Sequence, residues 1–574
     1  MPDLVVRHGD ELLRENLAVL ARRHPGLVQR LCLPVDSSHV RIDAQGRMLY
    51  RSLRNWKTLS LDSAQLARLV APAEAAEEIF VYGIGAGEHV VASLREHPDA
   101  TVSVWDRDPW LMRLFLAREE LGDVLTSGRL RLMLGADLVH EAACYARSRV
   151  IAHPLLASIY RHERCFVEEG FGERRAMVVA GELFVEDLID ALHEASYQVF
   201  QLDTKLLSIE EMAVATQTLR PEFIAAINYR NGLAEFCHAR SIDLLSWEID
   251  PTRDRLRPCQ APTAHARIFT YRRAQIPEFR AAGFEAVTYL PLATNPKRRF
   301  PPDLEAQDDA ERYRAGLVFV GASMAEQARQ NRKDFLALYK ELIKPLPREA
   351  GDALIEDLLA EQRKDFSRYI VPELLAARAP DLLVAAERKD LRLDPVKLLA
   401  EMAAAEKRMS YLAALGRFGV RVWGDGYWRR LTASGARYMG PAEHFHELNY
   451  VYAGAAINVD IGRLYQSDMV TMRVFDVLGC GGFILAEYSE ALEDLFEIGA
   501  ELDAYRTLDE LGDKAAWYLA HPDKAQSIAR KGYEAVRGRH TIKGRVNQML
   551  ASLGGRVAQV SSTEAAVLTA PATP

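Results

Sequence analysis

The sequence predicts a parallel α/β protein with three doubly wound units in succession and a long helical insertion in the third. Short apolar runs alternate with helical stretches along most of the chain, as in parallel sheets joined by crossover helices. Several of these runs end in glycines or acids, which favours turns at the carboxyl ends of strands. The 574 residues suffice for about three domains, at roughly 100–200 residues per domain.

The first unit is predicted to span residues 1–172. Its strands are indicated by EIFVYGIGAG at 78–87, TVSVWDRDP at 101–109 and GRLRLMLGADL at 128–138, with helical stretches between them. Residues 1–75 combine an amphipathic stretch with polar, turn-rich sequence and are interpreted as a cap. We therefore expect an N-terminal Rossmann-like domain.

The alternation restarts near Arg174, and a second Rossmann-like domain is predicted over residues 173–301. Its strand-like runs are RAMVVAGEL, FIAAIN, IDLLSWEID, ARIFTYR and AVTYLPLA. A polar, acidic segment with prolines at its start follows, which is typical of a linker.

The third unit is predicted over residues 315–555 and begins with the strand GLVFVGAS. A stretch with helical periodicity, rich in Leu, Ala, Glu and Lys, interrupts it at about 333–417. The strand pattern then resumes with VRVWGDGYW, RYMG, AAINVDI and GGFILAEY. The small, polar residues at 556–574 are predicted to be a disordered tail.

Composition and charge argue against several classes of function. The formal net charge of -8 disfavours a protein that mainly binds nucleic acid, because that task requires a basic surface. The six cysteines include no C-x-x-C pair and no histidine cluster beside them, so a metal site is not indicated. The first residues lack the apolar run of a signal peptide, and no run of about 18 apolar residues occurs. We therefore expect a cytoplasmic protein without a transmembrane segment.

The most informative stretch is INVDIGRLYQSDMVTMRVFDVLGCGGFILAE. It predicts a strand, a loop, a helix at about 470–478, a glycine turn and another strand. A helix N-terminus at the carboxyl edge of a parallel sheet attracts anions, and Thr471 and Arg473 are predicted to add hydrogen-bond donors to a diphosphate there. Asp468 and Asp476 are predicted to hold hydroxyl groups of a sugar and of a ribose, since carboxylates accept paired hydrogen bonds.

This stretch resembles the C-terminal signature of GT-B glycosyltransferases. In that signature two glutamates are separated by seven residues, and the second opens an E-A-M-A-C-G-x-P-like run. Asp468 and Asp476 stand at the two acidic positions, and DVLGCGGF stands at the run. The resemblance implies a two-domain GT-B core, with Asp468 contacting the donor sugar at the catalytic centre and Asp476 contacting the ribose. Aspartate is shorter than glutamate by one methylene, which changes the reach of both side chains.

The resemblance is closer to the spore-maturation-type branch of this class. RVFDVLGCGGF fits that branch's R-x-F-[DE]-V-L-x-C-G-G-F pattern, and EDLFEIGAELDAY follows as it does there. The final helix, with His540, Thr541 and Arg545, is also similar, as are LVFVGAS, VWGDGYW, IDLLSWEIDP and AGFEAVTYLPLATNP. Together these segments cover about residues 175–550.

Three glycines at strand ends of the third unit, Gly321, Gly424 and Gly426, are predicted to let a nucleotide approach the backbone closely. Trp428 is interpreted as a core residue more readily than as a base-stacking one. The simpler alternative for Asp476 is a surface ion pair with Arg473, and for Asp468 a loop or capping carboxylate.

On the acceptor side, Glu248 and Asp250 follow a predicted strand and are candidate general bases for an acceptor hydroxyl. A strand-end turn at Asp250, with no catalytic role, is the alternative. Asn228 and Tyr229, which follow FIAAIN, are further candidates for lining a ligand cleft.

The N-terminal unit carries its own nucleotide-binding pattern. Gly83, Gly85 and Gly87 form a G-x-G-x-G turn after a strand, and Asp106 ends the next strand, which suits a nucleotide or S-adenosylmethionine with the acid on a ribose. FVYGIGAGEH followed by VWDRDP also resembles the N-terminal domain of the motility-associated-factor glycosyltransferases, which modify flagellins. That resemblance implies a domain without transfer chemistry, either vestigial or partner-binding.

The sequence therefore predicts a glycosyltransferase that uses a nucleotide sugar as substrate and requires no metal or other cofactor. The resemblance implies a protein acceptor, such as flagellin, or a cell-surface glycan. Two alternatives stay open: a bifunctional S-adenosylmethionine-dependent methyltransferase and glycosyltransferase, and a degenerate GT-B fold that binds without catalysis.

Overall fold

The computed structural model describes residues 3–52, 55–71, 77–181, 184–250, 256–343, 348–388 and 393–554. Within these ranges the strands form four sheets, three of which contain parallel strand pairs. The predicted α/β fold class is therefore confirmed, and each of the three predicted α/β units contains one of these parallel sheets. The predicted tail at 556–574 lies outside the described residues.

The chain divides into two compact units along a line that differs from the predicted domain boundaries. The first unit comprises residues 1–227 and 236–245, and the second comprises residues 228–235 and 246–574. This division runs through the second parallel sheet, so the boundaries predicted near residues 172, 301 and 315 stay predictions.

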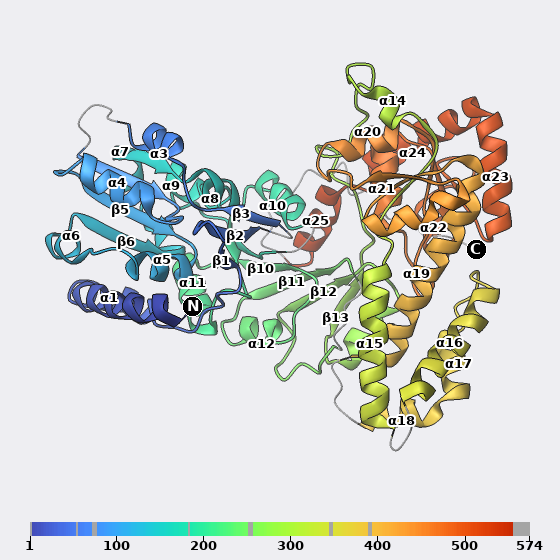
Figure 1. Ribbon diagram of the computed structural model, residues 1–574, viewed down its shortest axis with the longest axis horizontal. Helices are drawn as coiled ribbons and strands as arrows, with labels where there is room; N and C mark the ends of the chain where they lie inside the picture. The colour runs from blue at the N-terminus through green and yellow to red at the C-terminus, as the bar shows by residue number, and fades with distance from the viewer. Residues whose placement is uncertain are drawn as a thin grey trace. The chain divides into compact units, whose positions relative to one another are not determined.

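The first parallel sheet has the strand order β6-β5-β4-β7. Its strands are β4 (Glu78–Tyr82), β5 (Thr101–Asp106), β6 (Leu130–Leu134) and β7 (Arg149–Ala152). Helix α1 packs beside α6, and α3 packs beside α4 (Figure 1). The helices of this region are α1 (Asp3–Ala21), α2 (Pro25–Leu31), α3 (Ser63–Val70), α4 (Glu88–Glu96), α5 (Pro109–Leu116), α6 (Gly122–Ser127), η1 (Gly135–His140), α7 (Ala142–Arg147), α8 (Pro154–Ile159) and α9 (Cys165–Glu168).

Part of the predicted cap is a small antiparallel sheet. β1 (Val40–Ile42), β2 (Met48–Ser52) and β3 (Asn55–Thr58) pair in the order β1-β2-β3. The turn between the first two strands contains Gly46 at a positive φ of 76°. All three strands are short, and β1 and β3 are largely exposed, so the sequence has no long apolar run to mark them.

The second parallel sheet has the order β13-β12-β11-β10-β8-β9. Every apolar run predicted as a strand in this region forms one. The strands are β8 (Arg175–Val179), β9 (Gln198–Leu202), β10 (Phe223–Ile227), β11 (Asp243–Glu248), β12 (Ala266–Thr270) and β13 (Ala286–Tyr289), and the helices are α10 (Val185–Glu194), α11 (Ile209–Leu219), α12 (Leu233–His238) and α13 (Gln275–Ala281).

The third parallel sheet has the order β16-β15-β14-β17-β18-β19. Its strands are β14 (Ala315–Val320), β15 (Arg421–Trp423), β16 (Arg437–Gly440), β17 (Ala455–Val459), β18 (Ile484–Glu487) and β19 (Asp503–Tyr505). The helices outside the insertion are α14 (Ala310–Tyr313), η2 (Gly416–Phe418), η3 (Gly426–Ser434), α20 (Glu447–Ala453), α21 (Met472–Gly479), α22 (Glu490–Leu495), α23 (Leu508–Ala520), α24 (Pro522–Arg539) and α25 (Ile542–Ala551).

The described residues of the helical insertion form five helices with a hydrophobic core of their own. They are α15 (Ala325–Leu342), α16 (Arg348–Lys364), α17 (Val371–Arg378), α18 (Pro380–Arg388) and α19 (Pro395–Leu415). Helices α15 and α19 lie side by side (Figure 1), and Phe335, Leu358 and Leu399 are among the fully buried core residues. The insertion starts before the predicted residue 333, because the crossover helix after β14 runs into it without a break.

Candidate functional site

The third sheet reverses its strand order between β14 and β17. The chain adds β15 and β16 on one side of β14 and then β17, β18 and β19 on the other. Ligands of open parallel sheets bind beyond the carboxyl ends of the strands at such a reversal. Two segments lie there, residues 320–324 after β14 and residues 460–473 after β17, and we call them the C-terminal switch point. This position is the one in the domain best suited to an anionic ligand.

Arg473 and Thr471 meet at the C-terminal switch point through Asp460, the residue that follows β17. The buried Asp460 carboxylate accepts a hydrogen bond from the Thr471 hydroxyl at 2.8 Å and pairs with the Arg473 guanidinium. The Arg473 Nε also donates to the Val320 carbonyl at 2.8 Å. Because the Thr471 hydroxyl is used on Asp460, it does not cap α21. The first turn of α21 therefore presents amides without a side-chain cap beside a guanidinium.

Asp468, the predicted contact to the donor sugar, is held by the segment that follows β12. Arg272 donates from Nε to the Asp468 carboxylate at 2.7 Å, and the Ala274 amide donates to its other oxygen at 2.9 Å. The Asp468 side chain is 27% exposed. The carboxylate thus has fixed partners on both oxygens and still reaches solvent.

Asp476, the predicted ribose contact, is buried in an ion pair. Its carboxylate accepts from Arg299 Nε at 2.9 Å and from the Thr294 hydroxyl at 2.7 Å. The Asp476 side chain is 4% exposed and that of Arg299 is 1% exposed. The structure does not pair Asp476 with Arg473, which was the simpler alternative, since Arg473 pairs with Asp460. A ribose at Asp476 would have to displace two internal partners.

The glycines of the third unit allow close approach between chain segments. A Cβ at Gly424 would clash with the Gly321 carbonyl oxygen, and a Cβ at Gly321 would lie 2.8 Å from the Arg473 guanidinium. The buried Trp428 donates from its indole nitrogen to the same Gly321 carbonyl at 2.8 Å. Gly426 has no atom closer than 3.9 Å to its Cβ position. Packing within the protein therefore accounts for both glycines without a ligand, against backbone at Gly424 and against side chains at Gly321.

Two further arginines lie at the C-terminal switch point, and sequence reasoning does not single them out. Arg408, on α19, donates to the Ala322 carbonyl at 3.0 Å, and its buried Nε has no partner among the described residues. The Arg463 Nε lies 3.7 Å from Glu401, too far for a hydrogen bond, and also has none in the described chain. Burial, followed by the charges of Arg473 and Arg463, lowers the pKa of Arg408 to about 9.

Glu248, one of the two candidate bases, is a buried residue with its partners inside the protein. One of its oxygens accepts from the Tyr229 amide at 2.7 Å and from the Ser246 hydroxyl at 2.9 Å. Burial raises the pKa of Glu248 to about 7. The neighbouring Trp247 is fully buried. This carboxyl group fixes the end of β11 and the residue after β10.

Asp250, the other candidate base, is exposed. The Asn228 side-chain oxygen accepts from the Asp250 amide at 3.2 Å and from the Ile249 amide at 2.9 Å, which fixes the backbone after β11. Burial lowers the pKa of Arg463, but Glu401 and other groups, including Asp250, raise it above its usual range. The charge of Asp250 thus acts, as the smallest of these causes, on an arginine of the C-terminal switch point.

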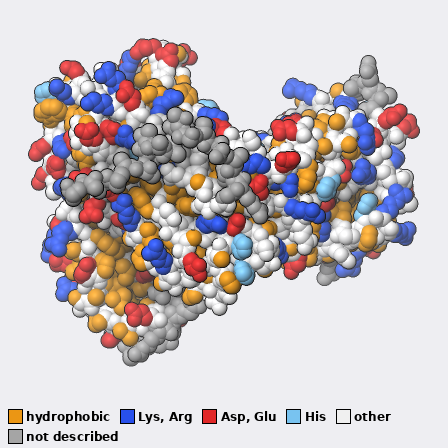
Figure 2. Space-filling view, turned by 180° about the vertical axis from the view of Figure 1, so that it is seen from behind, with side chains coloured by type: hydrophobic (Ala, Val, Ile, Leu, Met, Phe, Trp, Pro, Cys, Tyr) orange, Lys and Arg blue, Asp and Glu red, His pale blue; other side chains and the backbone are white. Residues whose placement is uncertain are grey.

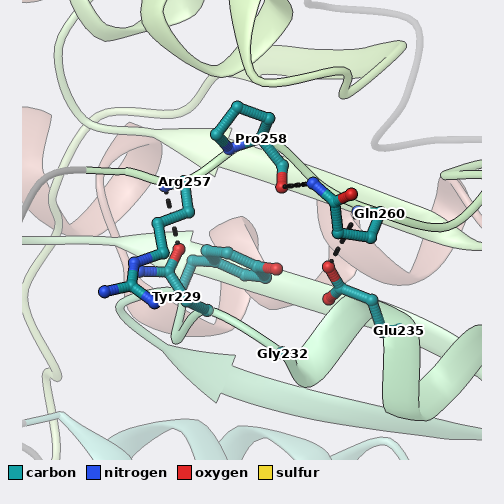
Figure 3. A pocket seen from close by; sticks show the side chains of 7 residues that line it. Tyr229, Gly232, Glu235, Arg257, Pro258 and Gln260 are labelled. Carbon is teal, nitrogen blue, oxygen red and sulfur yellow. Dashed lines mark hydrogen bonds between the residues drawn. The ribbon is translucent and has the colours of Figure 1, made fainter. Parts of the chain in front are cut away.

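A pocket of 670 Å³ opens beside the residues that follow β10. Its lining consists of Tyr229, Asn231, Gly232, Glu235, Arg257, Pro258 and Gln260. Figure 3 shows the Tyr229 hydroxyl pointing toward Glu235. The Glu235 carboxylate accepts a hydrogen bond from the backbone amide of Gln260 at 3.0 Å. The volume falls within the roughly 300–1,000 Å³ of small-ligand sites. The pocket is therefore large enough for part of an acceptor, with an aromatic ring and a carboxylate in its wall.

The first sheet has a reversal of its own, between β4 and β7, and we call residues 83–89 and 153 the N-terminal switch point. The glycine turn is present, with positive φ at Gly83, Gly85 and Gly87. A Cβ at Gly85 would clash with the His153 ring, and a Cβ at Gly87 would clash with the Phe115 ring. Side chains of the protein therefore occupy the space beside this turn.

Asp106, the predicted ribose contact of this region, is fully buried. Its carboxylate accepts from the Ile84 amide at 2.7 Å, the Asp108 amide at 2.8 Å and the Tyr160 hydroxyl at 2.9 Å. Burial and the nearby Asp108 raise the pKa of Asp106 to about 7. The carboxyl group stabilises the glycine turn from within.

Two buried histidines complete the N-terminal switch point. His89 Nε2 lies 2.9 Å from the Gly83 carbonyl oxygen, and His153 Nε2 lies 2.9 Å from the Leu59 carbonyl oxygen. Burial lowers the pKa of both rings, that of His89 to about 3. Both are neutral at pH 7, so this switch point carries no cation for a phosphate.

Charged groups elsewhere do not gather by sign on the face that Figure 2 shows, where acidic and basic side chains are interspersed. Among the residues that the structure describes, no group of three or more His, Cys, Asp or Glu is placed to hold a metal ion. No helix in the described ranges combines the length and apolar character needed to cross a membrane.

The part of the chain that contains the second segment of the C-terminal switch point, residues 460–473, is similar to a family of glycosyl transferases. Residues 402–551 match the family model described as glycosyl transferase-like. The matched range contains Arg408, Asp460, Arg463 and all of α21. The match confirms the predicted enzyme class, glycosyltransferase, for this part of the chain. No curated protein matches the chain.

Several solved structures are similar to the chain at low identity. Sucrose-phosphate synthase from Thermosynechococcus elongatus is 10% identical, covers 66% of this chain and 98% of its own, and gives a TM-score of 0.42. HepE from Anabaena, in complex with UDP and glucose, is 12% identical, with coverage of 66% and 99% and a TM-score of 0.38. The MAf glycosyltransferase from Magnetospirillum magneticum is 11% identical, with coverage of 52% and 59% and a TM-score of 0.22. No residue role is transferred from them.

Proposed function

We propose that this protein transfers a sugar from a nucleotide-sugar donor to a hydroxyl group of a protein or of a cell-surface glycan. The observation that carries the proposal is the glycosyl transferase-like match over residues 402–551. That range contains Arg473 and the start of α21 without a side-chain cap, at the place where parallel sheets bind ligands. Both features favour a diphosphate. The motif RVFDVLGCGGF supports the spore-maturation-type branch as the subfamily.

In the proposed reaction, Arg473 and the first turn of α21 stabilise the departing nucleoside diphosphate. The bond between the sugar C1 and the phosphate oxygen breaks, and preorganised positive charge meets the negative charge that develops. Since this charge comes from the protein, we propose that transfer needs no metal ion, with the nucleotide sugar as substrate and no further cofactor.

The acceptor hydroxyl oxygen forms the new bond to C1, and its proton goes to a general base. We propose Asp250 for this role, because it is exposed, whereas Glu248 is buried with its partners inside the protein. Asp468, which reaches solvent, is the proposed contact to the donor sugar. Asp476, ion-paired with Arg299 and nearly inaccessible, is proposed to hold α21 in place.

Flagellin is the first protein acceptor to test, because FVYGIGAGEH with VWDRDP resembles the N-terminal domain of flagellin-modifying enzymes. The pocket beside Tyr229 is the proposed place for part of the acceptor, and cell-surface glycans form the second acceptor class. We base no methyltransferase function on the N-terminal turn, since His153 fills the space beside Gly85.

The experiment is an assay of nucleotide release and sugar transfer with UDP-, GDP-, TDP- and CMP-sugars, with and without flagellin. Wild-type protein is expected to turn over one donor class in the presence of EDTA. Arg473→Gln should abolish most of this turnover, whereas Arg378→Gln, which changes an exposed arginine paired with Asp357, should not. Binding without turnover would instead favour a non-catalytic GT-B module, and absence of both binding and turnover would contradict the proposal.

A further inference from the structure

The helical insertion reaches the C-terminal switch point through one face of α19. Glu401 and Arg408 stand two helical turns apart and so project from the same side of the helix. Arg408 donates to the carbonyl of Ala322, in the loop after β14. Glu401 accepts a hydrogen bond from the Tyr465 hydroxyl, in the loop after β17. Helix α19 therefore contacts both loops of the switch point.

The loop after β17 contacts the insertion on both sides of Arg463, and these contacts hold Arg463 beside α19. Leu464 is buried in the hydrophobic core of the insertion. On the other side of the loop, the Gly462 amide donates to Glu487 at 2.9 Å, and Glu487 pairs with the buried Lys407 of α19. Arg463 lies between these two attachments, so its guanidinium is held near α19 by its neighbours in the sequence.

The arginines here have more donors than the protein satisfies. The Nε atoms of Arg408 and Arg463 are buried without a partner in the described part of the chain. A buried donor without an acceptor costs free energy, and each such group calls for a partner. Burial is the largest cause of the lowered pKa of Arg408, and the nearby charges of Arg473 and Arg463 lower this pKa further, against Asp460 and Glu401, which raise it. An anion with several oxygen atoms would supply the missing acceptors.

We propose that the helical insertion is part of the donor site, with Arg408 of α19 and Arg463 binding a phosphoryl group of the donor next to Arg473. The identity of the ligand as a nucleoside diphosphate rests on the proposed function. A guanidinium presents several N–H groups in one plane and matches phosphate oxygens in pairs, as a lysine does not. The insertion is then a binding element that supplies charge to a site built on the sheet.

The test is calorimetric titration of the full chain with inorganic pyrophosphate, UDP and uridine. Hydrogen bonds to charged groups contribute about 1.5–3 kcal/mol, so Arg408→Gln and Arg463→Gln should each weaken pyrophosphate and UDP binding about tenfold or more. Arg408→Lys should recover only part of this loss. Arg378→Gln, an exposed arginine of the same insertion, is the matched control and should bind as the wild type does. Uridine has no phosphate, so the affinity of the protein for uridine should be the same in all four variants as in the wild type.

A further variant, Glu401→Gln, tests whether charge rather than impaired folding causes the loss of binding. Glu401→Gln keeps an oxygen for the Tyr465 hydroxyl and removes a negative charge beside Arg463. It should tighten pyrophosphate binding about threefold, because the site becomes more positive. Unchanged pyrophosphate and UDP affinity in Arg408→Gln, or looser binding in Glu401→Gln, would overturn the inference.

The same measurements distinguish this inference from the proposed function. Pyrophosphate binding that depends on Arg408, in a protein that transfers no sugar, would support the phosphate site and contradict the proposed function. Sugar transfer with the same KM for the donor in wild type and Arg408→Gln would support the function and overturn the role of the insertion. Wild-type protein that binds neither pyrophosphate nor UDP, GDP, ADP or TDP would overturn the phosphate site.

Discussion

The N-terminal and C-terminal switch points occupy equivalent places in two parallel sheets, between β4 and β7 and between β14 and β17. The N-terminal one has the glycine turn associated with nucleotides, yet His153 and Phe115 fill the space beside it and its histidines are neutral. The C-terminal one has a single glycine after β14 and two arginines, Arg463 and Arg473, and a third, Arg408, contacts it from α19. The difference teaches that topology provides the position, whereas the side chains around it decide whether a phosphate can bind.

The glycines of the two regions add a second lesson. A side chain at Gly85 would clash with the His153 ring, and a side chain at Gly424 would clash with the Gly321 carbonyl. Both glycines therefore allow one part of the chain to approach another. A glycine pattern is therefore weak support for a nucleotide site unless free donors accompany it. At the C-terminal switch point these donors come from arginines that the glycine pattern does not include.

The largest expected effect concerns Asp476. Asp476→Ala leaves the Arg299 charge buried without its partner, which should lower the free energy of unfolding by about 3–5 kcal/mol in urea denaturation. Asp468→Ala is the matched control, because that ion pair is partly exposed and should contribute about 1 kcal/mol or less. An Asp476→Ala protein of wild-type stability with weaker nucleotide binding would instead favour the ribose contact that the motif implies.

Arg473→Gln should have the next largest effect, on catalysis. Removing one preorganised group that stabilises developing charge typically lowers kcat by about 100- to 1,000-fold, and we expect a loss of that size in steady-state transfer assays. Thermal unfolding of the same variant serves as the control for folding, since Arg473 also pairs with Asp460. Activity of Arg473→Gln within a factor of about three of the wild type would contradict the proposed catalytic role of Arg473 at the C-terminal switch point.

The histidines of the N-terminal switch point predict a smaller effect of pH. His89 has its pKa lowered to about 3 by burial, with His153 as the second cause, whereas the unfolded value is about 6.5. The unfolded chain therefore binds the proton more readily, and stability present above about pH 6.5 is lost as the pH falls toward 3. At about pH 5 the lowered pKa of His89 should reduce the free energy of unfolding by about 2 kcal/mol relative to neutral pH.

Urea unfolding at about pH 7 and about pH 5 measures this effect. His89→Gln keeps a donor for the Gly83 carbonyl and should reduce the difference between the two pH values by about 2 kcal/mol. His521→Gln, an exposed histidine, should leave the difference unchanged. Equal pH dependence in wild type and His89→Gln would show that the ring is not held neutral in the folded protein.

The smallest expected effect is the response of the N-terminal switch point to ligands. S-adenosylmethionine should leave the melting temperature unchanged, because His153 occupies the space beside Gly85 and Asp106 is bound by three internal donors. A nucleoside diphosphate at 100 times its dissociation constant should add about 2.7 kcal/mol of stability. A shift with S-adenosylmethionine that disappears in Asp106→Ala would restore the methyltransferase alternative.

Much of the fold could be predicted from the sequence because buried parallel strands are marked by apolar runs. FVYGIGAG, FIAAIN and AAINVDI each place a strand and the turn after it. The antiparallel strands β1, β2 and β3 were not predicted, because strands of three to five residues, two of them largely exposed, leave no such run. The sequence also contains no signal for the start of the insertion, because the crossover helix after β14 and the first helix of the insertion are the same helix, α15.

The candidate site could be predicted only where its residues are close in the sequence. Thr471 and Arg473 share one motif and lie together at the switch point. Asp460 had a usable signal, an acid at the carboxyl end of a strand, and was overlooked. Arg408 and the Arg299 partner of Asp476 had none, because their positions depend on how distant segments pack.

The most direct measurement of the central claim is a structure of the protein determined with UDP or with the nucleoside diphosphate that binds best. We predict phosphate oxygens within hydrogen-bond distance of the guanidinium groups of Arg408, Arg463 and Arg473, and no nucleotide at the glycine turn formed by Gly83, Gly85 and Gly87. A nucleotide bound at that turn, or bound with its phosphates away from all three arginines, would contradict the account.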